Sequence, residues 1–251
     1  MAGVEGKIAL VTGAGRGIGR DTALLLAERG ARVIAVARSE DELSSLGLDY
    51  VAADLGTAEG CSHAVEQARQ RLGPIEIFIC NHGIGSAHEK VIWEQDPQLW
   101  DETIRINLDG PFHLTRLIVA GMISEGYGRV VYTSSTAGEV AEYASAAYNS
   151  SKHALLGLMR SVAVDAGVHG ITSNAVLPGW VRTEMAENSA IAEAQERGIS
   201  TEEVWEERAA LYPAGRVATP REVAEMIAFL ASEESSGVSG QAITVALGGI
   251  Y

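Results

Sequence analysis

Short apolar runs alternate with longer amphipathic stretches along almost the whole chain. The runs are rich in Val, Ile, Leu and Ala, as in residues 7–12 (KIALVT) and 31–37 (ARVIAVA). Runs this short and this continuously apolar are typical of strands that are buried on both faces of a sheet. The runs that we expect to form strands are 7–12, 31–37, 50–53, 75–80, 129–133, 171–177 and 241–246.

The stretches between these runs have the spacing and the end signals of helices. A helix is expected over residues 57–72, capped by Thr57, and another over 220–231, with Thr219 as its cap and proline at its first position. Further helical stretches are expected over 23–29, 97–125 and 148–167, and a helix start at 200–203. The alternation predicts an α/β fold: a Rossmann-like, doubly wound parallel sheet of about seven strands, with helices on both faces.

The length and charge of the chain narrow the classes of function. The 251 residues fit one domain spanning 1–251, without an evident linker or repeat, and the net charge of -14 argues against nucleic acid or an anionic membrane as a partner. Cys61 and Cys80 have no metal-ligand spacing, so no metal site is expected and a reducing compartment fits best. With no apolar run long enough to cross a membrane, we expect a cytoplasmic protein.

A glycine-rich turn separates the first expected strand from the first expected helix. Residues 13–19 read GAGRGIG, so the glycines stand at Gly13, Gly15, Gly17 and Gly19 rather than in the literal Gly-x-Gly-x-x-Gly spacing. Glycines at such a turn let the backbone approach a pyrophosphate, which is bound at the helix N-terminus. The turn therefore predicts a dinucleotide site.

The end of the second expected strand bears on the choice of cofactor. NAD sites usually place Asp or Glu there, to bind the ribose 2′-hydroxyl, whereas this chain has Ala37 followed by Arg38. Together with Arg16 in the glycine turn, Arg38 would suit a 2′-phosphate, so NADP(H) is preferred over NAD(H). The alternative is that both arginines are solvated surface charges, and Glu40 and Asp41 lie close enough to weaken the case.

Tyr148 and Lys152 stand four residues apart on an expected helix, so their side chains are neighbours on one face. An ammonium beside a phenol favours the phenolate and lowers the phenol pKa, which would give a group able to exchange a proton near neutral pH. The alternative is an ordinary amphipathic helix. Asn107 lies inside another expected helix, where it indicates either a kink or water site, or a polar residue on the helix surface.

Candidate residues follow the strands at the edge where doubly wound sheets bind ligands. The residues that follow expected strands are Gly13, Arg38, Asp54, Asn81, Ser135 and Pro178. In order and spacing, the motifs along the chain resemble those of the short-chain dehydrogenase/reductase family in its form of about 250 residues. They are Thr12-Gly13-x-x-x-Gly17-x-Gly19, Asp54-Leu55, Asn107, Ser135 thirteen residues before Tyr148, Tyr148-x-x-x-Lys152, and Pro178-Gly179-x-x-x-Thr183.

The resemblance implies a role for each matching residue. Tyr148 would be the general acid in ketone reduction and the base in alcohol oxidation, Lys152 would lower its pKa and hold the nicotinamide ribose, Ser135 would bind the substrate oxygen, and Asn107 would hold a water in the proton relay. The residues implied to bind the cofactor are Gly13, Arg16, Gly17, Ile18, Gly19, Arg38, Asp54, Leu55, Asn81, Tyr148, Lys152, Pro178, Gly179, Val181 and Thr183, with Val181 and Thr183 at the nicotinamide carboxamide.

Two segments depart from the family pattern. Cys80-Asn81-His82-Gly83 replaces Asn-Asn-Ala-Gly, and we favour a space-filling role for His82 over one in the substrate pocket. Residues 245–249 (VALGG) replace the more frequent Val-Asp-Gly-Gly. Within the family the resemblance is greatest to 3-oxoacyl-[acyl-carrier-protein] reductases and polyketide ketoreductases, on residues 178–185, 213–216 and 240–242.

Substrate choice is expected to depend on residues 184–212, a lid, and on residues 138–143, a second wall. In the lid, Trp205 and Tyr212 either line an apolar pocket or pack the lid on the body. A phosphopantetheine-linked substrate would need a cation outside the lid, such as Arg129 or Arg182.

The resemblance predicts an NADP(H)-dependent oxidoreductase that interconverts a small-molecule ketone and a secondary alcohol, and a homotetramer by analogy. One alternative is an NAD(H)-dependent secondary-alcohol or sugar dehydrogenase of the same fold. A non-catalytic cofactor-binding regulator is a second, although it has no need for Asn107, Ser135, Tyr148 and Lys152 together. A nucleotide-sugar epimerase or dehydratase usually carries a further domain, for which 251 residues leave no room.

Overall fold

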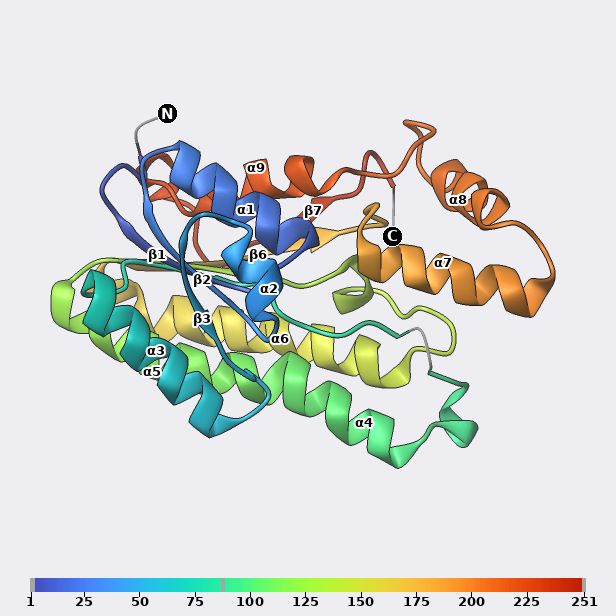
Figure 1. Ribbon diagram of the computed structural model, residues 1–251, viewed down its shortest axis with the longest axis horizontal. Coiled ribbons are helices and arrows are strands. Elements are labelled where there is room, and N and C mark those ends of the chain that lie inside the picture. Colours follow the sequence, from blue (N-terminus) through green and yellow to red (C-terminus); the bar gives the residue numbers. More distant parts are fainter. Residues whose placement is uncertain (1–2, 87–88, 250–251) are drawn as a thin grey trace.

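Seven parallel strands form one sheet between two layers of helices (Figure 1). The computed structural model describes residues 3–86 and 89–249. The strand order is β3-β2-β1-β4-β5-β6-β7, and every neighbouring pair is parallel. The strands are β1 (Ile8–Thr12), β2 (Arg32–Ala37), β3 (Asp49–Ala52), β4 (Ile77–Cys80), β5 (Gly128–Thr133), β6 (Ile171–Pro178) and β7 (Ala242–Val245). The predicted doubly wound sheet is confirmed.

The helices cover both faces of the sheet and one of its ends. They are α1 (Gly17–Glu28), α2 (Glu40–Ser44), α3 (Ala58–Leu72), α4 (Pro97–Ile104), α5 (Gly110–Glu125), α6 (Ala146–Ala166), α7 (Glu184–Arg197), α8 (Thr201–Ala210) and α9 (Pro220–Leu230). The short α2 was not expected from the sequence. Among the described residues, no helix is long and apolar enough to span a bilayer.

Alternate residues of each strand enter different hydrophobic cores, as the pleat of a strand requires. Leu10 of β1 packs with α3, α5 and α6 on one face, whereas its neighbours Ala9 and Val11 pack with α1 and α9 on the other. Figure 1 shows α1 and α9 above the sheet and α3, α5 and α6 below it. All five residues of β1 are buried, which explains why the run is apolar without interruption.

The predicted helix caps are present. The Thr57 hydroxyl accepts a hydrogen bond from the backbone N–H of Gly60 at the start of α3. Capping boxes begin α8, from Ser200 with Glu203, and α9, from Thr219 with Glu222. In each box, the N-cap hydroxyl accepts from the N–H of the glutamate, and the glutamate carboxylate accepts from the N–H of the N-cap residue.

The helical stretch over 97–125 contains a π-helical turn, Arg105–Asp109, between α4 and α5. Asn107 lies in this turn and its side chain is 1% exposed, so the alternative of a polar residue on the helix surface is wrong. A π turn is an inserted residue within a helix and is frequent at functional sites. It lets α5 begin at Gly110, where a Cβ atom would lie 2.1 Å from the carbonyl oxygen of Leu55.

The strand order reverses between β1 and β4. The chain builds outward from β1 through β2 and β3, then crosses back to place β4 on the other side of β1. Loops on either side of this switch diverge and leave a crevice at the carboxyl edge of the sheet. The candidate site lies in this crevice.

Candidate active site

A cavity of about 980 Å³ opens at the carboxyl edge of the sheet. Every strand from β1 to β6 contributes residues to its wall, directly or from the loop that follows. The residues that the sequence placed at strand ends are therefore brought together. Predicted site residues that line it are Gly13, Arg16, Gly17, Ile18, Arg38, Asp54, Leu55, Asn81, Ser135, Tyr148, Lys152, Pro178, Gly179, Val181 and Thr183.

The glycine turn has no room for side chains. Gly13 and Gly17 have positive φ angles of 63° and 55°, which L side chains rarely adopt. A Cβ atom on Gly19 would lie 2.1 Å from the carbonyl oxygen of Gly13. The N-cap residue of α1, Arg16, makes no side-chain cap hydrogen bond, and the first two residues of the helix, Gly17 and Ile18, line the cavity. This combination fits a pyrophosphate.

The two arginines expected at a 2′-phosphate differ in their surroundings. Arg38 is exposed and lines the cavity next to α2. Arg16 lines it too, but its guanidinium donates to the Glu184 carboxylate of α7 at 2.7 Å and lies 4.0 Å from the Glu42 carboxylate. A ligand phosphate would have to compete with two carboxylates for Arg16.

The turns after β3 and β4 are held by their own side chains. The Asp54 carboxylate accepts from the Gly56 N–H at 3.0 Å, and the Asn81 amide donates to the carbonyl of Gly13 at 3.4 Å. The Thr12 hydroxyl accepts from the backbone N–H groups of Asn81 and His82, at 2.9 and 3.2 Å. Thr12 thus ties the end of β1 to the start of the loop after β4.

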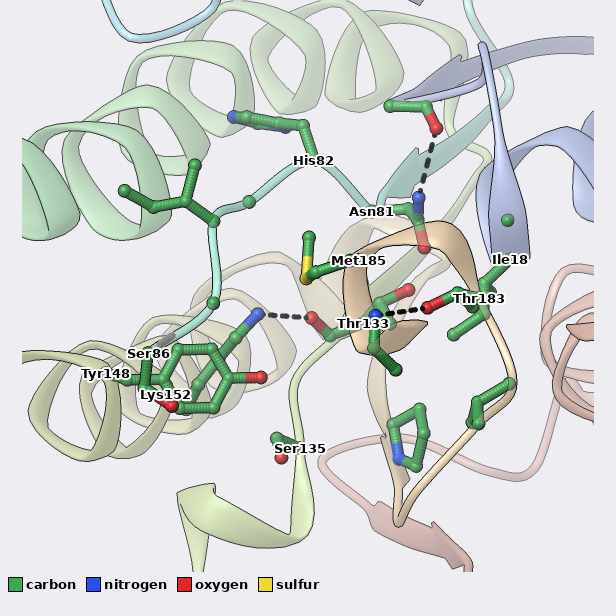
Figure 2. A pocket seen from close by; sticks show the side chains of 18 of the residues that line it. Ile18, Asn81, His82, Ser86, Thr133, Ser135, Tyr148, Lys152, Thr183 and Met185 are labelled. Carbon is green, nitrogen blue, oxygen red and sulfur yellow. Dashed lines mark hydrogen bonds between the residues drawn. The ribbon is translucent and has the colours of Figure 1, made fainter. Parts of the chain in front are cut away.

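His82 lies on the cavity wall, but its imidazole points away from Tyr148 and Lys152 (Figure 2). Its Nδ1 is 2.9 Å from the Thr12 hydroxyl, and its Nε2 is buried beside Gly110 without a hydrogen-bond partner among the described residues. Burial lowers the pKa of His82 to about 3, so the ring stays neutral. His82 therefore forms part of the cavity wall, as the alternative to space-filling predicted, while its ring packs against Thr12 and Gly110.

The Asn107 side chain makes three hydrogen bonds to neighbouring segments. Its oxygen accepts from the Ile84 N–H at 2.8 Å, and its nitrogen donates to the Ile84 carbonyl at 3.0 Å and to the Ser151 hydroxyl at 3.2 Å. A Cβ atom on Gly83 would lie 3.1 Å from the Asn107 oxygen and 3.6 Å from the Lys152 nitrogen. The two polar atoms therefore border one small space.

Tyr148, Lys152 and Ser135 gather at one end of the cavity (Figure 2). The Lys152 ammonium donates to the Thr133 carbonyl at 3.1 Å and lies 5.5 Å from the centroid of the Tyr148 ring. Burial raises the pKa of Tyr148 to about 12, and the Ser135 hydroxyl opposes that rise. Burial lowers the pKa of Lys152 to about 8. Burial therefore dominates the pKa of Tyr148 in this arrangement, and the lowering of that pKa by the Lys152 ammonium stays a prediction.

The turn after β6 closes the cavity opposite Tyr148. Thr183 lies beside Ile18 of the glycine turn (Figure 2), and a Cβ atom on Gly17 would lie 3.2 Å from the Thr183 methyl group. The Thr183 hydroxyl accepts from the Ala186 N–H and so caps α7. Val181 pairs with Ala218 in an isolated β-bridge.

The expected lid consists of α7 and α8. Of its two aromatic residues, one packs inside the lid and the other lines the cavity. Trp205 is buried in a small core of its own and donates to the Glu187 carboxylate at 2.9 Å, so it packs within the lid. Tyr212 lines the cavity, and its hydroxyl accepts from the Trp180 N–H at 2.6 Å. The second expected wall, residues 138–143, also contributes to the cavity lining, through Val140 and Tyr143 among others.

The two arginines considered for a phosphopantetheine group are engaged elsewhere. Arg129 is buried near the amino end of β5, where it donates to the carbonyls of Gly128 and Ser232. Arg182 lies over the Trp205 ring, at 5.0 Å, and 3.2 Å from the Glu202 carboxylate. Neither lines the cavity. Among the described residues that do, Arg16, Arg38 and Lys152 are the arginines and lysines.

Two contacts near Tyr148 were not expected. Lys152 is bound by a backbone carbonyl, for which no residue type gives a signal, and the Glu142 carboxylate of the second wall raises the Tyr148 pKa. The sequence placed Glu142 in that wall without linking it to Tyr148. Over 3–86 and 89–249, no group of three or more His, Cys, Asp or Glu residues is arranged to hold a metal ion.

Fold and cavity together define a class: a doubly wound α/β protein with a dinucleotide-type glycine turn at its topological switch. A family model described as "Enoyl-(Acyl carrier protein) reductase" matches residues 13–249. The chain belongs to the short-chain dehydrogenase/reductase family, whose members are oxidoreductases of ketone and alcohol substrates with a nicotinamide cofactor.

Similar proteins match over nearly their whole length. The 3-oxoacyl-[acyl-carrier-protein] reductase of Escherichia coli is 34% identical, over 98% of both chains. The D-beta-hydroxybutyrate dehydrogenase of Cupriavidus necator is 34% identical, over 94% of this chain and 95% of its own. Actinorhodin polyketide ketoreductase, solved with NADPH, has a TM-score of 0.91 at 32% identity and full coverage of both chains. The L-sorbose reductase of Gluconobacter frateurii, solved with NADPH and L-sorbose, has a TM-score of 0.92 at 28% identity, over 99% and 98%.

Proposed function

We propose that this protein is an NADP(H)-dependent oxidoreductase that interconverts a ketone and a secondary alcohol, with Tyr148 as the general acid and base. The observation that carries the proposal is the meeting of Tyr148, Ser135 and Lys152 at one end of a cavity whose other end is the glycine turn. A bound dinucleotide supplies the hydride, so the protein has to supply orientation and a proton.

The residues present fit that dinucleotide. The side-chain-free turn and the first N–H groups of α1 would bind the pyrophosphate. Asp54 and Leu55, in the turn after β3, line the cavity and would contact the adenine, and Val181 and Thr183, in the turn after β6, line it and would contact the nicotinamide carboxamide.

Proton transfer in the reduction direction is assigned to Tyr148. Its phenol, whose pKa is raised to about 12, is protonated at neutral pH and can donate to a carbonyl oxygen, while the Ser135 hydroxyl stabilises the charge developing there. Lys152 and the Asn107 oxygen border the same small space beside Gly83, which suits a water molecule that returns the proton. Both N–H bonds of the Asn107 amide are already in use, so that water would donate to Asn107.

The preference for NADP(H) over NAD(H) is supported by Arg38 and by the absence of an acidic residue at position 37. Arg38 is exposed on the cavity wall. The relatives solved with NADPH are consistent with this preference. Arg16 contributes less, because Glu184 holds it. NAD(H) dependence remains the alternative within the same fold.

The charges of the cavity favour an uncharged substrate. Its described arginines and lysines belong to the proposed cofactor end or to Lys152, while Glu142 contributes a partly buried carboxylate to the substrate wall. A substrate carboxylate or phosphate near Glu142 would meet like charge in a poorly solvated site. We therefore propose substrates that are uncharged close to the ketone.

We also propose a homo-oligomer, with a tetramer expected by analogy to the family. Apolar side chains are exposed on helices of one layer: Phe112 of α5 is 48% exposed and Val164 of α6 is 78% exposed. Exposed apolar side chains on neighbouring helices are typical of subunit contacts. Sedimentation of the purified protein tests this, and a monomer at micromolar concentration would contradict it.

Tyr148→Phe tests the mechanism. A panel of neutral ketones, keto acids and acyl thioesters is first assayed by nicotinamide absorbance with both cofactors. On the best substrate we expect kcat to fall by about 10²–10⁴-fold in Tyr148→Phe, as for loss of a general acid, with cofactor binding retained. Tyr50→Phe is the control, because it removes a phenol hydroxyl that donates to Glu40 on the surface. Near wild-type turnover in folded Tyr148→Phe would refute the assignment.

Arg38→Ala tests the cofactor preference. Loss of a charge-assisted hydrogen bond worth about 1.5–3 kcal/mol lowers kcat/KM for NADPH by about 10–100-fold and leaves NADH nearly unchanged. Arg32→Ala, at the opposite end of β2, is the control. An unchanged preference in Arg38→Ala would remove Arg38 from the proposal.

A further inference from the structure

Helix α6, which carries Tyr148 and Lys152, begins without a cap from its own N-cap residue. The Ser145 hydroxyl donates to the Tyr143 carbonyl at 3.0 Å and makes no cap hydrogen bond. The N–H groups of Ala147 and Tyr148, the second and third residues of the helix, would then be unpaired. These are the two N–H groups that an N-cap side chain ordinarily binds.

The Glu89 carboxylate supplies the missing cap from a distant part of the chain. One oxygen accepts from the Ala147 N–H and the other from the Tyr148 N–H, each at 2.8 Å. Burial raises the pKa of Glu89, and these two hydrogen bonds oppose that rise. An anion at this position also interacts favourably with the helix dipole.

The connection that carries Glu89 is fastened at its other end to Asn107. Ile84 exchanges two hydrogen bonds with the Asn107 side chain, and Gly85 and Ser86 between these points line the cavity. Figure 2 shows the chain running from His82 to Ser86 on the side of the cavity where Tyr148 lies. The connection therefore links the π turn to the first turn of α6.

We propose that Glu89 is a positioning residue for Tyr148: its carboxylate fixes the first turn of α6, and with it the phenol, against the connection after β4. The proposal rests on the proposed function, because it concerns the proton donor named there. The first turn of an uncapped helix frays readily, and Tyr148 is itself one of the two N–H donors. A displacement of about 1 Å at a reacting group can lower the rate by about 10²-fold.

Position and charge make separable contributions at Glu89. The carboxylate binds two N–H groups, and its negative charge also raises the pKa of Tyr148. Glu89→Gln removes the charge but keeps an amide oxygen that can accept from an N–H group. Glu89→Ala removes both the charge and the acceptor. A comparison of the two variants therefore distinguishes a cap from a purely electrostatic effect.

The experiment measures kcat, the KM for the cofactor, and the pH dependence of ketone reduction in both variants. In Glu89→Ala we expect kcat to fall about 100-fold while the cofactor KM stays within about twofold of wild type. Glu89→Gln should restore most of that kcat. In both variants, reduction should be lost at a lower pH than in wild type, because the phenol ionises more readily. Glu94→Ala, an exposed carboxylate in the same connection, is the matched control.

Two results would overturn the inference. One is a kcat in Glu89→Ala within twofold of wild type while Tyr148→Phe is inactive. The other is an equal loss in Ala and Gln variants together with a raised cofactor KM, which would indicate general damage to the fold. An active Tyr148→Phe would instead refute the proposed function itself. If Glu89→Ala does not fold, the Glu89→Gln variant alone tests the inference. It should then have a kcat near that of wild type and lose ketone reduction at a lower pH than wild type.

Discussion

Replacement of Asn107 by alanine tests whether the π turn is held by the amide that lies in it. The side chain is 1% exposed and makes three hydrogen bonds, two with the backbone of Ile84 and one with the Ser151 hydroxyl. Asn107→Ala removes all three. The N–H and carbonyl of Ile84 would then lose partners that no neighbouring side chain replaces.

The expected cost follows from the number of groups left unpaired. A buried polar group without a partner costs about 1–3 kcal/mol. Ile84 borders the cavity, so water can reach it and the lower part of that range applies to each of its two groups. We expect Asn107→Ala to lower the free energy of unfolding by about 2–4 kcal/mol, which corresponds to about 4–16 °C in Tm for a chain of this size.

Thermal and urea unfolding, followed by circular dichroism, measure this loss. Asp109→Ala is the control, because Asp109 lies in the same π turn and is exposed. It should change the free energy of unfolding by no more than about 0.5 kcal/mol. A similar, small change in both variants would show that the amide does not hold the turn, and the argument from its three hydrogen bonds would be refuted.

Three other predictions concern the glycine turn, the second wall and a helix cap. Gly19→Ala places a Cβ atom 2.1 Å from the Gly13 carbonyl oxygen, so the glycine turn must open. Cofactor affinity, measured by fluorescence titration, should then fall at least tenfold. An unchanged affinity would contradict this close approach. Glu142→Gln removes a negative charge that raises the pKa of Tyr148, so this pKa should fall. Ketone reduction should then be lost at a lower pH than in wild type. An unchanged pH dependence of the rate would show that the Glu142 charge does not affect the Tyr148 pKa. Thr219→Ala removes the N-cap hydroxyl of α9 and should cost about 1 kcal/mol in urea unfolding, with no change in kcat.

The sheet and the ends of its strands could be predicted because buried parallel strands are almost wholly apolar. Strands β1, β2, β4, β5 and β6 stop where a polar or glycine residue follows, and in a parallel sheet these ends meet at one edge. Gly13, Asn81 and Ser135 belong to three different strand ends, and all three line the cavity. Their convergence follows from the direction of the strands alone.

Contacts between distant segments could not be predicted in this way. Arg16 is bound by Glu184, 168 residues further along the chain, and Glu89 by the N–H groups of Ala147 and Tyr148, 58 and 59 residues further on. No periodicity marks these partners, because each lies in a loop or at a helix end. The sequence therefore predicted Arg16 as a phosphate ligand without its ion pair to Glu184. It did not indicate that Glu89 binds the start of α6.

For Tyr148 and Lys152, sequence spacing predicts that the side chains are neighbours but not which groups they bind. Four residues on a helix place the two side chains on one face, but the end of β5 decides what the ammonium binds: it donates to the Thr133 carbonyl and lies 5.5 Å from the Tyr148 ring. Burial of the two groups raises the pKa of Tyr148 to about 12 and lowers that of Lys152 to about 8. A phenol with this pKa is protonated throughout the neutral range, which is the state that the proposed general acid needs. Alcohol oxidation needs the phenolate, which costs about 1.4 kcal/mol for each pH unit below the pKa. The surroundings of Tyr148 therefore suit the proposed step, in which the protonated phenol donates to a ketone at neutral pH.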